Sequence, residues 1–329
     1  MITYYYLTKS RCSYSIIAKH HIQVLKNYTK VEEADVQYDI KPNLYALVHP
    51  LFFLRDKEGV NRLAKNHKYI IGFEVSDTDR PSDEWVEFLN NPKIDLIITA
   101  SNFSYYAFKN AGVTNRIEVV PHGVSRKFRP YPKRPKTENI RVLTFIQHTP
   151  FRKGADILIE IAKRFPKVHF TSKGEGMKIW NQELIPPNIS VIDRWMEEED
   201  LVNFYNQHDI YLATQRGGGF EICPLEALAC GLPVISSAYG SVLDYLNSHN
   251  SILVSPVGKT KLFDKNPYHH GNVCQPDTQH LADALGRCIE NLDEEKEKAL
   301  KASIRIRAKF NWYSIGKRIF NLIREIAEW

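Results

Sequence analysis

The sequence predicts an α/β protein with two open parallel sheets, each covered by helices on both faces. Short apolar runs alternate with longer amphipathic stretches along almost all of the 329 residues. This alternation is typical of parallel strands joined by crossover helices. The chain is also long for a single hydrophobic core. A proline-rich, charged stretch, Arg129–Asn139, divides it near the middle.

Each predicted strand is a short apolar run, and each predicted helix is a longer amphipathic stretch. The predicted strands are Tyr4–Thr8, Leu44–His49, Tyr69–Val75, Leu96–Ala100, Ile117–Val120, Val142–Ile146, Val168–Ser172, Ile189–Ile192, Ile210–Ala213, Pro233–Ser236 and Ser251–Val254. The predicted helices are Tyr14–Asn27, Asp83–Asn90, Asn102–Ala111, Gly154–Arg164, Glu198–His208, Leu225–Cys230, Thr278–Leu292 and Glu294–Phe310.

The stretch Arg129–Asn139 is expected to be exposed, because it holds three prolines and several charges but no apolar periodicity. It places an N-terminal domain at residues 1–131, a linker at 132–139 and a C-terminal domain at 140–311. Ligands of open α/β sheets bind beyond the carboxyl ends of the strands. Two such sheets that face each other form a cleft, where we expect the ligand.

Composition and charge argue against several classes of protein. No apolar run reaches about 18 residues, and residues 1–10 do not resemble a secretory signal. The net charge of +6 suits phosphates or an acidic membrane surface but is too small to predict nucleic-acid binding. The five cysteines form no CxxC pair and no zinc spacing, which indicates a reducing environment.

Three motifs that would indicate other functions are missing, incomplete or too common to be informative. The first strand is followed by TKSRCSYS rather than by the GxGxxG turn of dinucleotide-binding domains. Gly258–Thr260 matches only the end of a P-loop, because the first glycine of that motif falls at Leu253. The DxD tripeptide Asp77–Asp79 has a spacing that can hold a divalent metal, but it is frequent by chance, and no metal is predicted.

A glycine-rich turn follows the predicted strand Ile210–Ala213. The segment Thr214–Phe220 holds three consecutive glycines, and a short helix is expected between Pro224 and Gly231. Glycines before a helix allow close approach of a ligand, and the N–H groups of a helix N-terminus favour an anion. Glu226 therefore has two interpretations: a ligand-binding carboxylate, or a first-turn carboxylate that stabilises its own helix.

Two further turns lie at the carboxyl ends of predicted strands. Residues 147–154 (QHTPFRKG) bring Arg152 and Lys153 to the start of a helix, where the helix dipole disfavours cations. A bound diphosphate accounts for both charges, and solvated loop charges are the alternative. The next strand is followed by Lys173–Gly176. Together the three turns predict an anion-binding edge of one sheet.

From about Tyr69 to the C-terminus, the order of these segments resembles the retaining nucleotide-sugar glycosyltransferases of the GT-B fold (glycosyl transferases group 1, family 4-like). The similar segments are Asp95–Pro130, Arg152–Gly154, Gly174–Gly176, Asp209–Ala213, Phe220–Ser236 and Phe310–Trp312. Ile71–Trp85 and Val120–Val124 resemble a subgroup with FE…P..W and VVPHGV motifs.

The resemblance implies two Rossmann-like domains that face each other across a cleft, with a last helix at about 312–329 that returns to the N-terminal domain. It implies transfer of a sugar from a UDP- or GDP-linked donor with retention at the anomeric carbon. Glu226 is then expected to bind the donor ribose, and Arg152 and Lys153 to neutralise the diphosphate. No metal or other cofactor is required. The implied donor-binding residues are His148, Arg152, Lys153, Gly174, Gly218, Gly219, Phe220, Ile222 and Glu226.

The chain departs from the family pattern at three places. The first glutamate of the paired E-x7-E pattern falls at Gly218. Glu221, where a small residue is usual, is a candidate to take over its sugar contacts. The arginine expected before the phosphate turn aligns with His148, so Arg152 is a candidate substitute. The usual glycine-rich loop after the first strand is replaced by Ser10–Ser13.

In the N-terminal domain, the active-site histidine of the family corresponds to Phe73-Glu74. Glu74 is predicted to be a carboxylate that faces the reaction centre, and a helix-cap or salt-bridge role is the alternative. Glu74 and Glu221 are thus the predicted catalytic residues. His122 and Gly123 are further candidates to line the cleft.

The sequence therefore predicts a retaining, metal-independent hexosyltransferase of glycan biosynthesis, acting on a glycan, lipid-linked or protein acceptor and not on nucleic acid. A non-catalytic nucleotide-sugar-binding protein, or a sugar-nucleotide hydrolase or epimerase on the same fold, is the alternative. The expected location is cytoplasmic, with peripheral association with the inner membrane face as a further option.

Overall fold

The computed structural model describes residues 1–132, 139–179, 182–262 and 268–328. The chain divides into two units. Unit 1 comprises Met1–Gly123, Phe263–Gly271 and Phe310–Trp329, and unit 2 comprises Val124–Leu262 and Asn272–Lys309. Residues 133–138, most of the predicted linker, lie outside the described residues.

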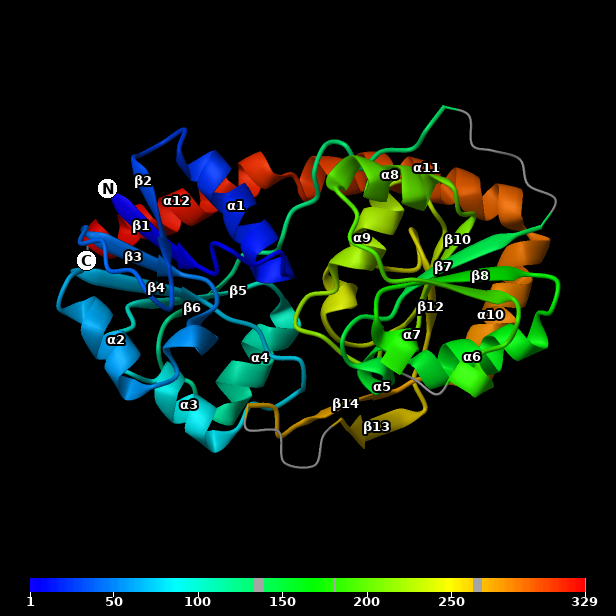
Figure 1. Cartoon of the computed structure of the whole chain (residues 1–329), viewed down its shortest axis with the longest axis horizontal. Helices are drawn as coiled ribbons and strands as arrows, with labels where there is room; N and C mark the ends of the chain where they lie inside the picture. Colours follow the sequence, from blue (N-terminus) through cyan, green and yellow to red (C-terminus); the bar gives the residue numbers. More distant parts are fainter. Residues whose placement is uncertain (133–138, 180–181, 263–267, 329) are drawn as a thin grey trace. The chain divides into compact units, whose positions relative to one another are not determined.

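Unit 1 is built on a six-stranded parallel sheet with the order β2-β1-β3-β4-β5-β6 (Figure 1). Its strands are β1 (Ile2–Tyr6), β2 (Val31–Asp35), β3 (Tyr45–Val48), β4 (Tyr69–Phe73), β5 (Leu96–Thr99) and β6 (Ile117–Val119). Its helices are α1 (Ser13–Leu25), η1 (Leu51–Leu54), α2 (Lys57–Ala64), α3 (Asp83–Leu89), α4 (Asn102–Ala111) and α12 (Trp312–Glu328).

The three consecutive tyrosines of β1 show how this sheet is buried on both faces. Tyr4 and Tyr6 belong to a core shared with α1 and α12, whereas Tyr5 belongs to the core on the opposite face with α2, α3 and α4. Successive side chains of a strand point to opposite faces, so one short run contributes to both cores. Figure 1 shows α1 and α12 on one side of the sheet and α2 to α4 on the other.

Helix α12 packs closely on α1. A Cβ atom at Gly316 of α12 would lie 2.5 Å from Val24 Cγ1, so glycine allows the two helices to approach. Buried residues of α12 complete the core that begins with β1 and α1, and they are Trp312, Ile315, Ile319, Leu322, Ile323 and Ile326.

Unit 2 contains a six-stranded parallel sheet with the order β12-β11-β10-β7-β8-β9. Its strands are β7 (Arg141–Phe145), β8 (His169–Lys173), β9 (Ile189–Ile192), β10 (Ile210–Ala213), β11 (Val234–Ser237) and β12 (Ile252–Val254), and an antiparallel pair is formed by β13 (Gly258–Lys261) and β14 (Asn272–Gln275). Its helices are α5 (Pro150–Lys153), α6 (Ala155–Arg164), α7 (Gly176–Ile179), η2 (Gln182–Leu184), α8 (Glu198–Asn206), α9 (Ile222–Ala229), η3 (Gly240–Asp244), α10 (Thr278–Glu290) and α11 (Leu292–Lys309). The strand order reverses between β7 and β10, which is where open α/β sheets bind ligands.

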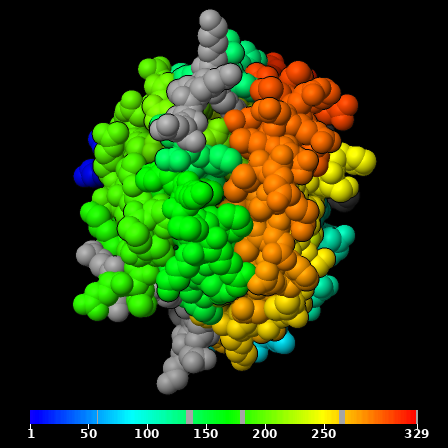
Figure 2. Space-filling model, turned by 90° about the vertical axis from the view of Figure 1, so that its right-hand side faces the viewer, coloured from blue at the N-terminus to red at the C-terminus, as the bar shows by residue number. Residues whose placement is uncertain are grey.

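Both faces of this second sheet are also covered. Ile210 and Leu212 of β10 lie in a core with α6 and α10. Tyr211, between them, lies on the other face, where its ring centroid is 6.3 Å from that of Tyr205 in α8. Figure 2 shows the orange surface of α10 and α11 beside the green surface of the segments around α6.

All the strands predicted from the sequence are present, and the α/β fold with two parallel sheets is confirmed. Three strands were not predicted: β2, β13 and β14. The VEEAD sequence of β2 is mostly polar because it is an edge strand. The helix expected from Leu225 begins at Ile222 instead, so Pro224 is its third residue, a first-turn position that proline tolerates.

Candidate active site

Two loops of unit 2 meet at the reversal between β7 and β10. The backbone N–H of Arg216 donates to the carbonyl of Arg152 at 2.8 Å, and the Thr214 hydroxyl donates to the carbonyl of Lys153 at 2.7 Å. A Cβ atom at Gly154, whose φ is +75°, would lie 2.1 Å from the Thr214 carbonyl oxygen. Glycine is therefore required for this approach. The fold thus brings two of the three predicted turns together.

Lys153 and Glu221 form an ion pair where the loops meet. Nζ of Lys153 lies 2.7 and 2.6 Å from the two carboxylate oxygens of Glu221. The two side chains are only 15% and 9% exposed. Nη1 of Arg152 lies 3.8 Å from the same carboxylate and donates to the Gly217 carbonyl at 3.2 Å. Among the described contacts, two cations, Lys153 and Arg152, thus lie beside one carboxylate, that of Glu221.

The prediction that Arg152 and Lys153 lie at the start of a helix, where its dipole disfavours cations, is wrong. Both residues lie in the last turn of α5, and Gly154 separates them from α6. The end of a helix favours cations rather than disfavouring them. Instead, both cations lie beside the Glu221 carboxylate, and Arg152 also donates to the Gly217 carbonyl.

The side chain of Glu221 packs against the backbone of Gly218. A Cβ atom at Gly218 would lie 2.0 Å from Oε1 and 2.8 Å from Cδ of Glu221. The carboxylate of Glu221 therefore occupies the space where a side chain at position 218 would begin. The site holds a carboxylate next to Gly218, supplied from three residues further along the chain.

Glu226 lies in the second turn of α9, and the first turn contains no acidic residue. Its position rules out the interpretation of Glu226 as a first-turn carboxylate. Its side chain is buried, and Oε2 accepts a 2.8 Å hydrogen bond from the Tyr205 hydroxyl. Burial raises the pKa of Glu226 to about 8, and the Tyr205 hydrogen bond opposes this rise.

The other predicted donor-binding residues also lie in unit 2. Ile222 is the first residue of α9, and Gly219 and Phe220 directly precede it. The backbone N–H of Gly174 donates to the Ile192 carbonyl at 2.8 Å, at the carboxyl end of β8. His148 is exposed and pairs with Glu175 at 2.7 Å, so its contacts do not join those of Lys153 and Glu221.

Sequence reasoning missed the residues that hold the loops in place. The guanidinium of Arg216 donates to both carboxylate oxygens of Asp156 at 2.8 and 2.7 Å and lies 3.9 Å from the centroid of the Phe151 ring. Tyr245 donates to the backbone carbonyl of Glu221. Tyr205 was also missed. The one signal in the sequence for these residues was Arg216, which directly precedes three glycines.

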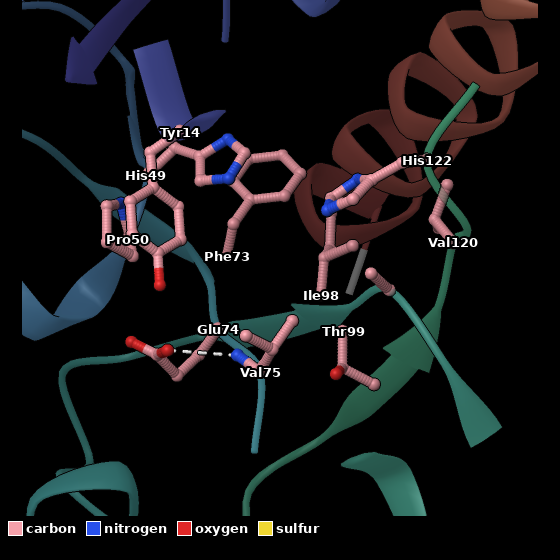
Figure 3. A pocket seen from close by; sticks show the side chains of 11 residues that line it. Tyr14, His49, Pro50, Phe73, Glu74, Val75, Ile98, Thr99, Val120 and His122 are labelled. Carbon is pink, nitrogen blue, oxygen red and sulfur yellow. Dashed lines mark hydrogen bonds between the residues drawn. The ribbon is translucent and has the colours of Figure 1, made fainter. Parts of the chain in front are cut away.

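Unit 1 contains a small pocket of about 20 Å³, room for roughly one water molecule. Glu74 lines it, and both carboxylate oxygens accept 2.9 Å hydrogen bonds, from the backbone N–H groups of Phe52 and Val75. Burial raises the pKa of Glu74 to about 8. Figure 3 shows the rings of Tyr14, His49, Phe73 and His122 on one side of the pocket and Glu74 on the other.

Three buried histidines cluster beside this pocket. The ring centroids of His21, His49 and His122 lie 5.6 to 6.4 Å apart. The Tyr4 hydroxyl contacts Nδ1 of His21 at 2.8 Å and Nδ1 of His49 at 3.2 Å. Gly123 has a packing role, since a Cβ atom there would lie 2.6 Å from the Trp312 indole.

Within residues 1–132, 139–179, 182–262 and 268–328, no three His, Cys, Asp or Glu side chains are grouped so that they could hold a metal ion. The helices described in these ranges are all too short or too polar to cross a membrane.

The sequence is similar to several known proteins. Residues 140–291 match the family Glycosyl transferases group 1. Protein 356 of Sulfolobus islandicus rod-shaped virus 1 is 28% identical, over 90% of each chain. A GDP-mannose-dependent monoacylated alpha-(1-6)-phosphatidylinositol monomannoside mannosyltransferase of Corynebacterium glutamicum is 24% identical, over 80% of this chain and 69% of that protein.

The structural comparison shows the fold. Anabaena HepE, solved with UDP and glucose, superimposes with a TM-score of 0.75 at 16% identity, over 98% of this chain and 99% of that chain. The two parallel-sheet α/β units thus match the Rossmann-like domains of GT-B structures, and the predicted GT-B fold is confirmed.

Proposed function

We propose that this protein is a retaining, metal-independent glycosyltransferase that transfers a sugar from a nucleotide diphosphate sugar to an acceptor hydroxyl. The observation that carries the proposal is the grouping of Arg152, Lys153 and Glu221 at the strand-order reversal of unit 2, with the buried carboxylate of Glu226 five residues further along in α9. Cations there suit a diphosphate, and a buried carboxylate suits the hydroxyl groups of a ribose.

Each residue has a role in this proposal. Arg152 and Lys153 neutralise the negative charge that develops on the diphosphate as the sugar leaves. The backbone at Gly219, Phe220 and Ile222, at the start of α9, binds phosphate oxygens. Glu221 contacts the sugar in place of a glutamate at position 218. Because cations and a helix N-terminus supply the positive charge, the reaction needs no metal.

The names of the compared proteins support a UDP- or GDP-linked donor, since HepE was solved with UDP and the corynebacterial enzyme depends on GDP-mannose. A glycan, a lipid-linked sugar or a protein hydroxyl stays the predicted acceptor. A cytoplasmic location, with peripheral association with the inner membrane face as a further option, also stays a prediction. The catalytic role of Glu74 also stays a prediction, because its described hydrogen bonds bind both carboxylate oxygens within unit 1.

The proposal is tested by incubating the purified protein with UDP- and GDP-sugars, with and without EDTA. We expect release of UDP or GDP that continues in EDTA and is accelerated by an acceptor. Retention of anomeric configuration is read from the product by NMR. Binding of nucleotide-sugars without any turnover would instead indicate a binding protein, and loss of turnover in EDTA would contradict metal independence.

Gly218→Ala is expected to lower the activity of the protein much more than its stability. The new Cβ atom would overlap Oε1 of Glu221, so the flexible carboxylate has to move away from Lys153. We expect the free energy of unfolding to fall by no more than about 1 kcal/mol, while turnover falls about tenfold. Urea unfolding and initial rates of donor turnover measure the two effects.

Two controls accompany this variant. Gly258→Ala adds a methyl group where no atom lies within 4 Å, and it should change neither quantity. Gly218→Ala combined with Glu221→Ala should be no less active than Glu221→Ala alone, because both changes act through the same carboxylate. Additive losses in the double variant would show that Gly218 acts independently of Glu221.

A further inference from the structure

Glu226 has a defined hydrogen-bonding environment that the proposed function does not use. Among the described residues, the Tyr205 hydroxyl, at 2.8 Å from Oε2, is the hydrogen-bond partner of the Glu226 side chain. The same hydroxyl lies 3.3 Å from the Cys223 carbonyl. Oε1 of Glu226 is therefore the carboxylate oxygen that this bond leaves for a ligand.

Tyr205 is itself held firmly. It is fully buried, and its ring stacks on Phe145 with centroids 5.5 Å apart and an interplanar angle of 12°. The Phe128 ring contacts it edge-on at 5.8 Å. Because these contacts fix the ring, the hydroxyl has little freedom to move away from Glu226.

The chemistry of the site requires such a partner. A ribose presents two neighbouring O–H donors, and an ionised carboxylate accepts both, whereas a protonated one has lost acceptor capacity. Burial favours the protonated form of Glu226 and raises its pKa to about 8, the Tyr205 hydrogen bond lowers it, and the negative charge of Glu198 raises it. Tyr205 thus counteracts the effect of burial.

We infer that Tyr205 is a positioning residue that orients Glu226 and favours its ionised form, so that Oε1 can accept the hydroxyl groups of a nucleotide ribose. This inference rests on the proposed function for the identity of the ligand but not for the action of Tyr205 on Glu226. In the part of the chain that the structure describes, the titratable groups that interact electrostatically with Glu226 are Tyr205 and Glu198 of α8, Cys223 of α9, Tyr211 of β10 and Tyr245 after η3.

The test compares Tyr205→Phe with Tyr211→Phe, a buried tyrosine that does not hydrogen-bond Glu226 among the described contacts. The titration of the Glu226 carboxyl is followed by 13C NMR in the full chain, with Glu226→Gln to assign the signal. Binding of UDP and of GDP is measured by calorimetry at pH 7 and pH 9.5.

In Tyr205→Phe we expect the titration midpoint of Glu226 to rise by about one pH unit. Nucleotide affinity should then fall about tenfold at pH 7 and recover at pH 9.5, where the carboxylate ionises in both proteins. Tyr211→Phe should behave as the wild type. In a Glu226→Gln background, Tyr205→Phe should have no further effect on affinity.

An unchanged titration of Glu226 in Tyr205→Phe overturns the inference, as does an equal loss of affinity at both pH values. If the wild type binds neither UDP nor GDP, the proposed function fails. The NMR titration still decides whether Tyr205 controls the ionisation of Glu226, so the two failures are distinguishable.

Discussion

Replacing Lys153 with alanine should lower sugar transfer about 100- to 1,000-fold, the usual loss when one preorganised charge-stabilising donor is removed. Nζ of Lys153 is largely buried, and Arg152, 3.8 Å from the Glu221 carboxylate, is too far away to replace it fully. Initial rates with saturating donor measure this effect. A loss of less than about threefold would contradict the proposed role of Lys153.

Lys153→Ala should also destabilise the protein, because it leaves the carboxylate of Glu221 without its nearest cation. Removing one partner of a buried pair costs about 3–5 kcal/mol, and the proximity of Arg152 should keep the cost at the low end. The double variant Lys153→Ala/Glu221→Ala removes both charges. It should regain most of the stability but none of the activity, which separates folding from chemistry.

The histidine cluster of unit 1 should make the protein sensitive to acid. Burial, followed by the charges of neighbouring imidazoles, holds the pKa of His21 and of His49 well below the usual range, and burial lowers that of His122 to about 3. His122 is therefore neutral in the folded protein at pH 5, and the lowered pKa values of His21 and His49 favour their neutral forms as well. In the unfolded chain each imidazole binds a proton below about pH 6.5.

The sign of the effect follows from proton binding. Since the unfolded state takes up more protons on these histidines, stability falls as the pH drops below about 6.5. His122 alone accounts for about 2 kcal/mol of this loss at pH 5, and His21 and His49 act in the same direction. Glu74 and Glu226 act in the opposite direction. Their raised pKa values give stability that is fully present below the unfolded pKa, near 4.5, and lost as the pH rises through about 8.

The contribution of one histidine is isolated by comparing variants, because the two glutamates then act equally on both proteins. Urea unfolding of the wild type and of His122→Asn is measured at pH 7 and pH 5. The difference between the two pH values should be smaller by about 2 kcal/mol in the variant. The exposed His249→Asn serves as the control. Equal pH dependence in wild type and His122→Asn would contradict the expectation.

The fold could be predicted because its strands are buried on both faces and so read as continuous apolar runs. Runs such as Leu96–Thr99 and Ile210–Ala213 are fully buried. Edge strands lack this signal, which is why β2 was missed. The start of α9 was misplaced because Pro224 was taken as its beginning, although the helix accommodates proline at its third position.

The candidate site could be predicted only in part. The turns after β7 and β10 were recognised because parallel strands direct their carboxyl ends to one edge. The contact between Glu221 and the space at Gly218 depends on atomic positions that spacing does not give. Tyr205 lies 21 positions before Glu226, on a different helix, and nothing in the local sequence links the two.

The packing of α12 on α1 has a consequence for the order of folding during synthesis. Ribosomal synthesis delivers β1 and α1 first, but it delivers α12 only after all of unit 2. Ile315, Ile319 and Ile323 of α12 are part of the core around β1. The apolar residues of β1 and α1 that pack against them therefore stay exposed until α12 has been synthesised. Unit 2 consists of Val124–Leu262 and Asn272–Lys309, which are close together in the sequence. It can therefore acquire its native core before α12 is synthesised.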